Sequence, residues 1–234
     1  MTAVSRLLIA VSLAGVLSIG TAPGAMGAQP SSSPSPHAPT AGIPAEYDAL
    51  VSFWEQNHVP KAKQKQLFAT LEAGGTWDSM EGGSANLVST HTSKQDGMKV
   101  TKYTYQDGSI RVDAVDIPIT SSSDGGITPQ SVTKCSYSGG SYWYSYTDCK
   151  AMSSVGIASL WFYFDYSGSY SSSSINKYYD IGCSVLAGTC SDRHFTKISS
   201  RNVRALADFF QAGSTNTIGV GVKVSGPNAS TYNL

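Results

Sequence analysis

The sequence has little charge and no excess of either sign. Sixteen Lys and Arg balance sixteen Asp and Glu among 234 residues, and only 14% of the residues are charged. Proteins that bind nucleic acid neutralise phosphates with an excess of Lys and Arg, which this sequence lacks. We therefore expect no nucleic-acid partner. The aromatic content of 10% and the abundance of Ser, Thr and Gly favour a folded, strand-rich extracellular domain.

Signatures of catalysis and of metal binding are also scarce. The chain has four His, and it contains neither a Gly-x-Ser-x-Gly nucleophile elbow nor a His-Glu-x-x-His zinc helix. We predict no catalytic residue, no metal site and no cofactor. The best polar cluster is Asp192-Arg193-His194, and a salt bridge at a strand edge accounts for it as well as an acid–base pair does.

Long apolar runs occur only near the N-terminus. Arg6 precedes an apolar run over residues 7–17, and small residues at Ala25 and Gly27 fit a cleavage site before Ala28. A run of this length is too short to span a bilayer. Residues 1–27 are therefore predicted to be a secretory signal peptide. The protein is expected to be secreted and extracellular, with no membrane span in its mature form.

Two polar segments divide the rest of the chain. Residues 28–43 form a Pro/Ser tract, which predicts an extended, mobile linker. A second linker is predicted over residues 118–130. The remaining segments are residues 44–117, expected to hold a helical hairpin and a β-hairpin, and residues 131–234, expected to form an antiparallel β-sandwich domain.

The segment over residues 44–73 has the periodicity of helices. Tyr47, Leu50, Val51 and Trp54 follow the i, i+3, i+4, i+7 pattern of one helical face. A second apolar stripe lies in residues 67–71, and Gly74-Gly75 provides a stop signal. These patterns predict a short helical hairpin.

A β-hairpin is predicted around Asp107-Gly108, a dipeptide typical of a two-residue type I′ turn. Such a turn joins strands at residues 98–106 and 109–117. Its register places Lys102 opposite Asp113, and it places aromatic residues opposite aliphatic ones on the other face. We expect this hairpin to pack against the two helices.

The C-terminal segment shows repeated strand patterns separated by turn residues, which favours an antiparallel β-sandwich or a barrel-like domain. The predicted strands are residues 141–149, 155–166, 175–184, 190–198, 203–211 and 217–225. Residues 204–211 also fit a helical turn. The predicted fold class is α+β: an N-terminal helical hairpin with a β-hairpin, followed by this strand-rich domain.

The four cysteines are even in number and lie in the part expected to be exported. They permit three disulfide connectivities. Cys135–Cys149 and Cys183–Cys190 are favoured because each pair brackets a turn signal. A zinc site is the alternative, but the spacings do not match those of zinc knuckles.

The chain resembles a recurring pattern in secreted actinobacterial proteins. The residues that carry the resemblance are a short helical hairpin, the segment Gly74-Gly75-Thr76-Trp77-Asp78-Ser79, the turn from Tyr105 to Ser109, and a strand-rich C-terminal domain. The resemblance implies secretion from a Gram-positive cell and transfers no catalytic residue to this sequence.

Strand parity suggests an aromatic binding surface. Trp143 is an even number of residues from Cys149, so the two share one face of a strand and Trp143 is expected to cover the disulfide from inside. The apolar face over residues 158–164 is expected to point into the core. The aromatic residues left for the outward face are Tyr142, Tyr144, Tyr146, Trp161 and Tyr163. Aromatic surfaces of this kind suit sugar rings. Packing of the same side chains in the core is the competing interpretation.

Three functions follow from these patterns. The first is a non-catalytic β-sandwich that binds an extracellular surface glycan or protein. The second is an extracellular hydrolase that uses Asp192 with His194, or two carboxylates such as Asp165 and Asp180 on neighbouring strands. The third is an inhibitor-like or structural domain, for which a protruding, disulfide-braced loop over residues 136–148 is the expected feature.

Overall fold

The computed structural model describes residues 42–118, 135–169 and 171–232. The expected signal peptide, nearly all of the first linker, and the second linker beyond Pro118 lie outside these ranges.

Short helices come first in the described chain and strands follow. The helical elements are η1 (Ala45–Tyr47), α1 (Asp48–Gln56), α2 (Lys61–Glu72) and α3 (Asp78–Glu81). The strands are β1 (Leu87–Gln95), β2 (Met98–Tyr105), β3 (Ile110–Asp116), β4 (Ser136–Gly139), β5 (Tyr144–Ser154), β6 (Ala158–Ser169), β7 (Ser172–Val185), β8 (Thr189–Ser199), β9 (Asn202–Gln211), β10 (Ser214–Ser225) and β11 (Asn228–Tyr232).

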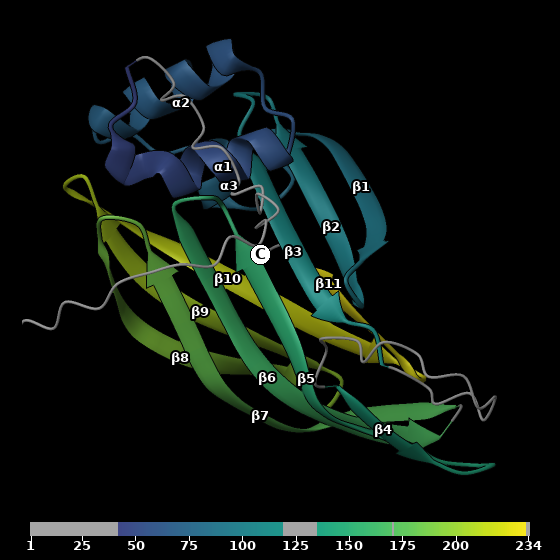
Figure 1. The fold of residues 1–234 in the computed structure, drawn as a ribbon. Helices are drawn as coiled ribbons and strands as arrows, with labels where there is room; N and C mark the ends of the chain where they lie inside the picture. The colour runs from purple at the N-terminus through teal and green to yellow at the C-terminus, as the bar shows by residue number, and fades with distance from the viewer. Residues whose placement is uncertain (1–41, 119–134, 170, 233–234) are drawn as a thin grey trace, which may run out of the picture. The chain divides into compact units, whose positions relative to one another are not determined.

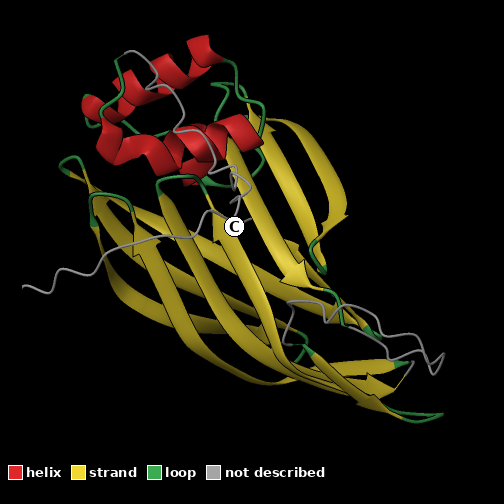
Figure 2. Cartoon of the chain, viewed as in Figure 1, coloured by secondary structure: helices red, strands yellow, loops and turns green. Residues whose placement is uncertain are grey.

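The described strands form two open antiparallel sheets (Figures 1 and 2). The first has the order β1-β2-β3-β5-β6-β7, with β4 paired to β5, and the second has the order β11-β10-β9-β8. Strand β3 pairs with β5 through Val112–Val115 and Ala151–Ser154. The β2–β3 hairpin therefore belongs to the same sheet as the later strands, and the predicted linker after residue 117 does not separate two sheets. Residues 204–211 are extended in β9.

The facing sides of the two sheets share one hydrophobic core. In β6 every second residue from Ala158 to Tyr166 is buried, which confirms the predicted apolar face. In β10 the alternating residues Ile218, Val220 and Val224 are also buried. Alternation with period two places one face of each strand inward, so the other face of β6 is left for contact with solvent or ligand.

Helices α1 and α2 form where the sequence predicts helices, and their apolar residues are buried. The buried residues of the two helices include Leu50, Val51, Trp54, Leu67, Phe68 and Leu71. Leu50 and Phe53 approach Gly156 so closely that a Cβ there would lie 2.8 Å from each side chain. The Ser214 hydroxyl donates to the Gly74 carbonyl at 2.7 Å. These contacts dock the helices onto the β5–β6 and β9–β10 turns.

The predicted register of the β2–β3 hairpin is wrong by one residue. Thr101 pairs with Asp113 and Lys102 with Val112, so Lys102 and Asp113 point to opposite faces of the sheet. The connection contains three residues, because Tyr105 N–H bonds to the Ser109 carbonyl at 3.1 Å.

The side chain of Asp107 explains this longer connection. Its carboxylate accepts the Ser109 N–H at 2.8 Å. Only Gly108 has positive φ, at 88°, whereas a type I′ turn needs positive φ at both central residues. The carboxylate therefore favours the three-residue turn over the two-residue one.

Both predicted disulfides are present. Cys135–Cys149 closes the base of the β4–β5 hairpin. Cys183–Cys190 joins β7 of the first sheet to β8 of the second. The second disulfide therefore links the two layers at the short connection between these strands.

Candidate functional site

A β-bulge in β5 changes which aromatic residues face outward. Tyr146 pairs with Tyr166, but Cys149 pairs with Phe164, so two residues of β5 oppose one residue of β6. Asp148 occupies the bulge with φ of 57°. The bulge puts Tyr146 and Cys149 on the same face although their sequence separation is odd.

The expectation that Tyr144 and Tyr146 face outward is therefore wrong. Both are buried, and Cys149 is buried beside them. Trp143, expected to cover the disulfide from inside, is instead 54% exposed. Alternation counted back from Cys149 therefore assigns the wrong face of the strand to the residues before the bulge.

The two buried tyrosines belong to a cluster that packs the end of the sheets near β4. Its members are Tyr137, Tyr144, Tyr146 and Tyr166, with neighbouring ring centroids 4.7–6.3 Å apart. The Tyr144 hydroxyl lies 2.6 Å from the Gly226 carbonyl and 3.0 Å from the Ser172 carbonyl. Burial raises the pKa of Tyr144 and that of Tyr166, so both hydroxyls stay protonated to a higher pH than an ordinary phenol does. This cluster is structural.

Trp161 and Tyr163 take the outward face of β6, as predicted, and both are half-buried there. Trp161 pairs with Gly182 of β7, and a Cβ on Gly182 would lie 2.1 Å from the indole ring. The ring therefore packs against the bare backbone of β7. Tyr163 stacks on Tyr179 of β7, with centroids 6.1 Å apart and planes at 22°.

Charged side chains surround these rings. The Lys150 ammonium lies 5.4 Å from the Trp161 ring centroid, and the Lys177 ammonium lies 4.2 Å from that of Tyr179. Asp165 accepts the Asp148 N–H at 2.9 Å. We use the name aromatic strip for the three rings and these four charged residues: Trp161, Tyr163, Tyr179, Lys150, Lys177, Asp148 and Asp165.

Tyr179 connects the rings of the aromatic strip to its carboxylates. Its hydroxyl donates to the Asp148 carboxylate and lies 3.3 Å from Asp165 Oδ1. Desolvation, followed by these two carboxylates, raises the pKa of Tyr179. The phenol therefore stays protonated and ties the β5 bulge to β7. The alternation of residues in the sequence does not place Tyr179 beside Tyr163, because bulges in β7 shift the register of that strand against β6.

The remaining predicted site residue, Tyr142, does not join the aromatic strip. It lies in the turn between β4 and β5, where it is 84% exposed. The five residues expected to share one surface are thus divided among the strip, the tyrosine cluster and this turn.

The two pairs considered for hydrolysis also have a clear structural setting. Asp192 Oδ2 and His194 Nδ1 are 3.6 Å apart, with side chains 70% and 48% exposed. Asp165 faces Lys177 across the strands, and its hydrogen bonds go to Asp148 and Tyr179 rather than to Asp180. The contact between Asp192 and His194 is largely exposed, so it contributes little energy and has the geometry of a surface contact.

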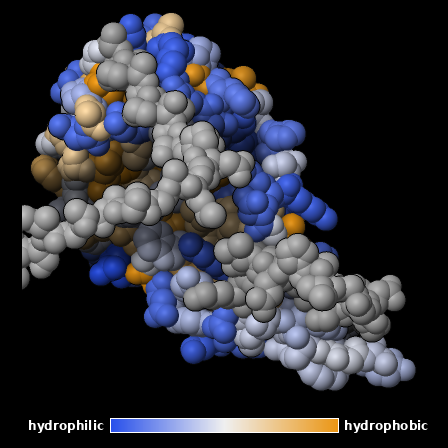
Figure 3. Space-filling view, viewed as in Figure 1, coloured by the Kyte–Doolittle hydropathy of each residue, from blue (hydrophilic) through white to orange (hydrophobic). Residues whose placement is uncertain are grey.

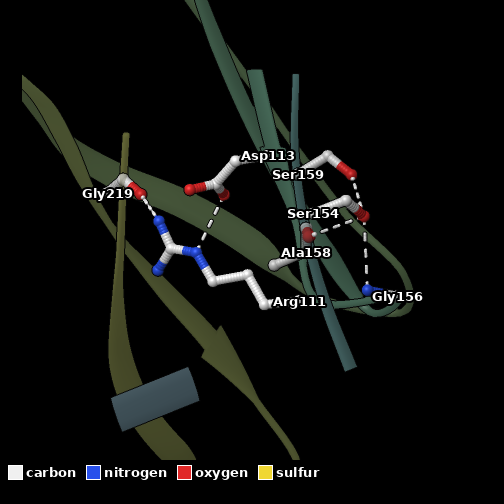
Figure 4. Close-up of polar contacts among 7 residues, drawn as sticks. All are labelled: Arg111, Asp113, Ser154, Gly156, Ala158, Ser159 and Gly219. Atoms are coloured by element: carbon white, nitrogen blue, oxygen red, sulfur yellow. Dashed lines mark hydrogen bonds and ion pairs between the residues drawn. The ribbon is translucent and has the colours of Figure 1, made fainter. Parts of the chain in front are cut away.

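Figure 4 shows a buried ion pair between the sheets. Arg111 Nε donates to Asp113 Oδ1 at 2.9 Å, and the same guanidinium donates to the Gly219 carbonyl of β10. Both side chains are almost fully buried. The pair therefore links the layers inside the core and is not open to a substrate, and the second carboxylate oxygen, Asp113 Oδ2, is buried without a hydrogen-bond partner among the described residues.

Among the described residues, no group of three or more His, Cys, Asp or Glu side chains is placed to hold a metal ion. Within the same ranges, none of the helices has the length and apolar character needed to cross a membrane. No protein family model, curated protein or solved structure matches the chain. The candidate site therefore rests on the geometry of the aromatic strip alone.

Proposed function

We propose that this chain is an exported, non-catalytic protein that binds a neutral extracellular glycan through the aromatic strip. In this proposal the two sheets act as a β-sandwich, with α1 and α2 as a helical hairpin at one end. The two disulfides support export, because such bonds persist in oxidising compartments. Membership of the secreted actinobacterial group is part of the same proposal.

The observation that carries the proposal is the position of Trp161. Its ring is half-buried against Gly182 and lies beside the stacked pair Tyr163 and Tyr179. Sugar rings stack their C–H faces on aromatic rings, and their hydroxyls bond to nearby polar groups. A backbone glycine behind the indole fixes the ring, so less side-chain entropy is lost when a ligand binds.

The charges of the aromatic strip favour a neutral ligand. Lys150 and Lys177 contribute two positive charges, and Asp148 and Asp165 contribute two negative ones. The sum is zero, so no net field attracts an acidic or a basic polymer. The lysines can donate hydrogen bonds and the carboxylates can accept them, which matches the mixed character of sugar hydroxyls.

The experiment is a titration of the purified chain with soluble neutral and acidic cell-wall polysaccharides. Binding is followed by isothermal titration calorimetry, because Trp161→Ala has no indole at the site whose emission could report it. Binding of a neutral polysaccharide is expected, with Trp161→Ala and Tyr163→Ala each weakening it by about tenfold or more. The proposal fails if no neutral polysaccharide binds, or if Trp161→Ala binds as tightly as the parent chain.

A stability control separates loss of binding from loss of folding. Trp161 is half-buried, whereas its neighbour Phe162 is fully buried. Phe162→Ala should cost about 3–5 kcal/mol of unfolding free energy. Trp161→Ala is expected to cost clearly less, so that its chain is still folded in the binding assay.

A further inference from the structure

The β4–β5 hairpin carries an aromatic tip that the aromatic strip does not use. Tyr142 and Trp143 lie in its turn, and both are exposed. The Gly140 N–H donates to the Trp143 carbonyl at 2.9 Å, and the Trp143 indole approaches Gly140 closely. Cys135–Cys149 closes the base of the hairpin. The two rings therefore stand on a turn that is ordered by hydrogen bonding at its tip and by a covalent bond at its base.

Two other turns lie beside this hairpin. The Tyr144 hydroxyl contacts the Ser172 carbonyl at the start of β7 and the Gly226 carbonyl of the β10–β11 turn. Tyr166 donates to the Pro227 carbonyl at 2.9 Å. These bonds hold segments of both sheets together below the tip. We use the name hairpin end for residues 136–147, 171–174 and 225–228.

The composition of the hairpin end is unusual because it contains no charged residue. It consists of Ser, Gly, Tyr, Trp, Thr, Asn and Pro. In Figure 3 this end of the molecule, near β4, is drawn mostly in the pale colours of intermediate hydropathy. Antibody combining sites use the same residues, because Tyr and Trp supply rigid contact area and Ser, Gly and Asn supply adaptable hydrogen bonds.

We propose that the hairpin end binds a folded extracellular protein, with Tyr142 and Trp143 as the anchors that enter an apolar pocket of that partner. Tyr and Trp are enriched among the residues that dominate protein interfaces. Anchors held in their bound arrangement lose less entropy on association. This interface is separate from the aromatic strip and does not depend on glycan binding.

Other partners fit the hairpin end less well. A polyanion or an anionic membrane is recognised by clusters of Lys and Arg; the hairpin end contains neither, and the single Arg201 of the adjoining β8–β9 turn does not form a cluster. Two partly exposed rings bury less apolar surface than a single myristoyl chain, which alone gives only marginal membrane binding. The hairpin end also lacks the charged hydrogen-bonding groups that surround the rings of the aromatic strip.

The test places a photoreactive amino acid, p-benzoylphenylalanine, at position 142 of the full chain. The chain is irradiated with cell-surface extract that is untreated, protease-digested or periodate-oxidised, and separately with phosphatidylcholine vesicles. The expected result is a crosslinked product that disappears after protease digestion and survives periodate. The captured partner is then purified and its affinity for the unmodified chain is measured. Trp143→Ser is expected to lower that affinity by about tenfold or more.

Phe210→Ser is the matched control, because Phe210 is an exposed aromatic residue, 49% accessible, on β9 next to the β9–β10 turn at the helical end. It should leave the affinity within about twofold, since exposed changes away from an interface have small effects. The proposal is overturned if no product forms, if periodate abolishes the product, or if vesicles alone shift the Trp143 emission to shorter wavelength. It is also overturned if Trp143→Ser and Phe210→Ser weaken binding equally.

Discussion

Asp78 and Asp107 each accept the backbone N–H of the other. Asp78 N lies 3.0 Å from Asp107 Oδ2, and Asp107 N lies 3.2 Å from Asp78 Oδ2. The remaining oxygens accept from Asn86 at 2.8 Å and from the Ser109 N–H at 2.8 Å. Every oxygen of the two carboxylates is thus engaged. This contact brings together the start of α3 and the β2–β3 turn, which are distant in the sequence.

Asp107→Ala should destabilise the fold, because it leaves the N–H groups of Asp78 and Ser109 without their acceptors. The expected loss is about 1–3 kcal/mol of unfolding free energy, measured by urea denaturation. Asp107→Asn retains one acceptor oxygen and should lose less. In a double-mutant cycle with Asp78→Ala, the two losses should be non-additive by more than about 0.5 kcal/mol. Additive losses would show that the reciprocal bonds do not act together.

Gly182→Ala should displace the Trp161 ring, because the new methyl group would occupy the position of the indole. Such overpacking costs about 1–3 kcal/mol. The change is expected to be visible in near-ultraviolet circular dichroism and to weaken glycan binding. The informative comparison is to make Gly182→Ala in a Trp161→Ala background, where it should have little further effect on the free energy of unfolding. An equal cost in both backgrounds would contradict the contact.

The β6 face and the disulfide connectivity were predictable from the sequence because each has a local signal. Phe162 and Phe164 alternate with polar or amphipathic residues, and each cysteine pair brackets a turn. Strand β1 was not predicted, because nearly all of its residues are exposed and it has no apolar alternation. Its strand conformation comes from pairing with β2, which a local pattern does not record.

Only part of the outward aromatic surface could be predicted from the sequence, because a single inserted residue in a strand exchanges its inward and outward faces beyond that point. Asp148 was the available clue, since Asp tolerates positive φ better than most residues. That clue is weak by itself: the bulge also needs Asp165 from β6 and Tyr179 from β7. The same limit applies to the hairpin register, where Asp107 is held by Asp78 from a distant segment.

Alkaline pH should destabilise the protein partly through Tyr103. Burial, aided by the nearby Asp113 carboxylate, raises the pKa of Tyr103 from 10.0 to about 12. Below pH 10 the phenol is protonated in both the folded and the unfolded chain. Between pH 10 and about 12 the unfolded chain loses this proton first, so the unfolding free energy falls as the pH rises.

The measurement for Tyr103 is urea denaturation at a series of pH values from 8 to about 12. Tyr103→Phe should show a shallower decline between pH 10 and 12 than the parent chain, because it removes one titrating phenol. Below pH 9 its pH dependence should match that of the parent. Parallel curves above pH 10 would show that Tyr103 has the same pKa in both states.

Tyr144 and Tyr142 offer a direct comparison between a structural and an exposed tyrosine. The Tyr144 hydroxyl contacts backbone carbonyls in two turns, whereas the Tyr142 side chain is largely in solvent. Tyr144→Phe should cost about 1–2 kcal/mol, because it removes the donor for these buried acceptors. Tyr142→Phe should stay within about 0.5 kcal/mol of the parent. Both are measured by thermal and urea unfolding, with the disulfides intact.

Alanine variants extend this comparison to the whole side chains. Tyr144→Ala removes a ring from the tyrosine cluster and should cost several kcal/mol, about 3–5 as for other large buried aromatic residues. Tyr142→Ala removes a ring that contacts little and should melt near the parent chain, while losing the protein partner proposed for the hairpin end. If Tyr142→Ala destabilised the chain as much as Tyr144→Ala does, Tyr142 would be a packing residue and not an anchor. A small loss for Tyr144→Ala would instead mean that the cluster does not hold the turns together, because the same ring then contributes neither packing nor its hydrogen bonds.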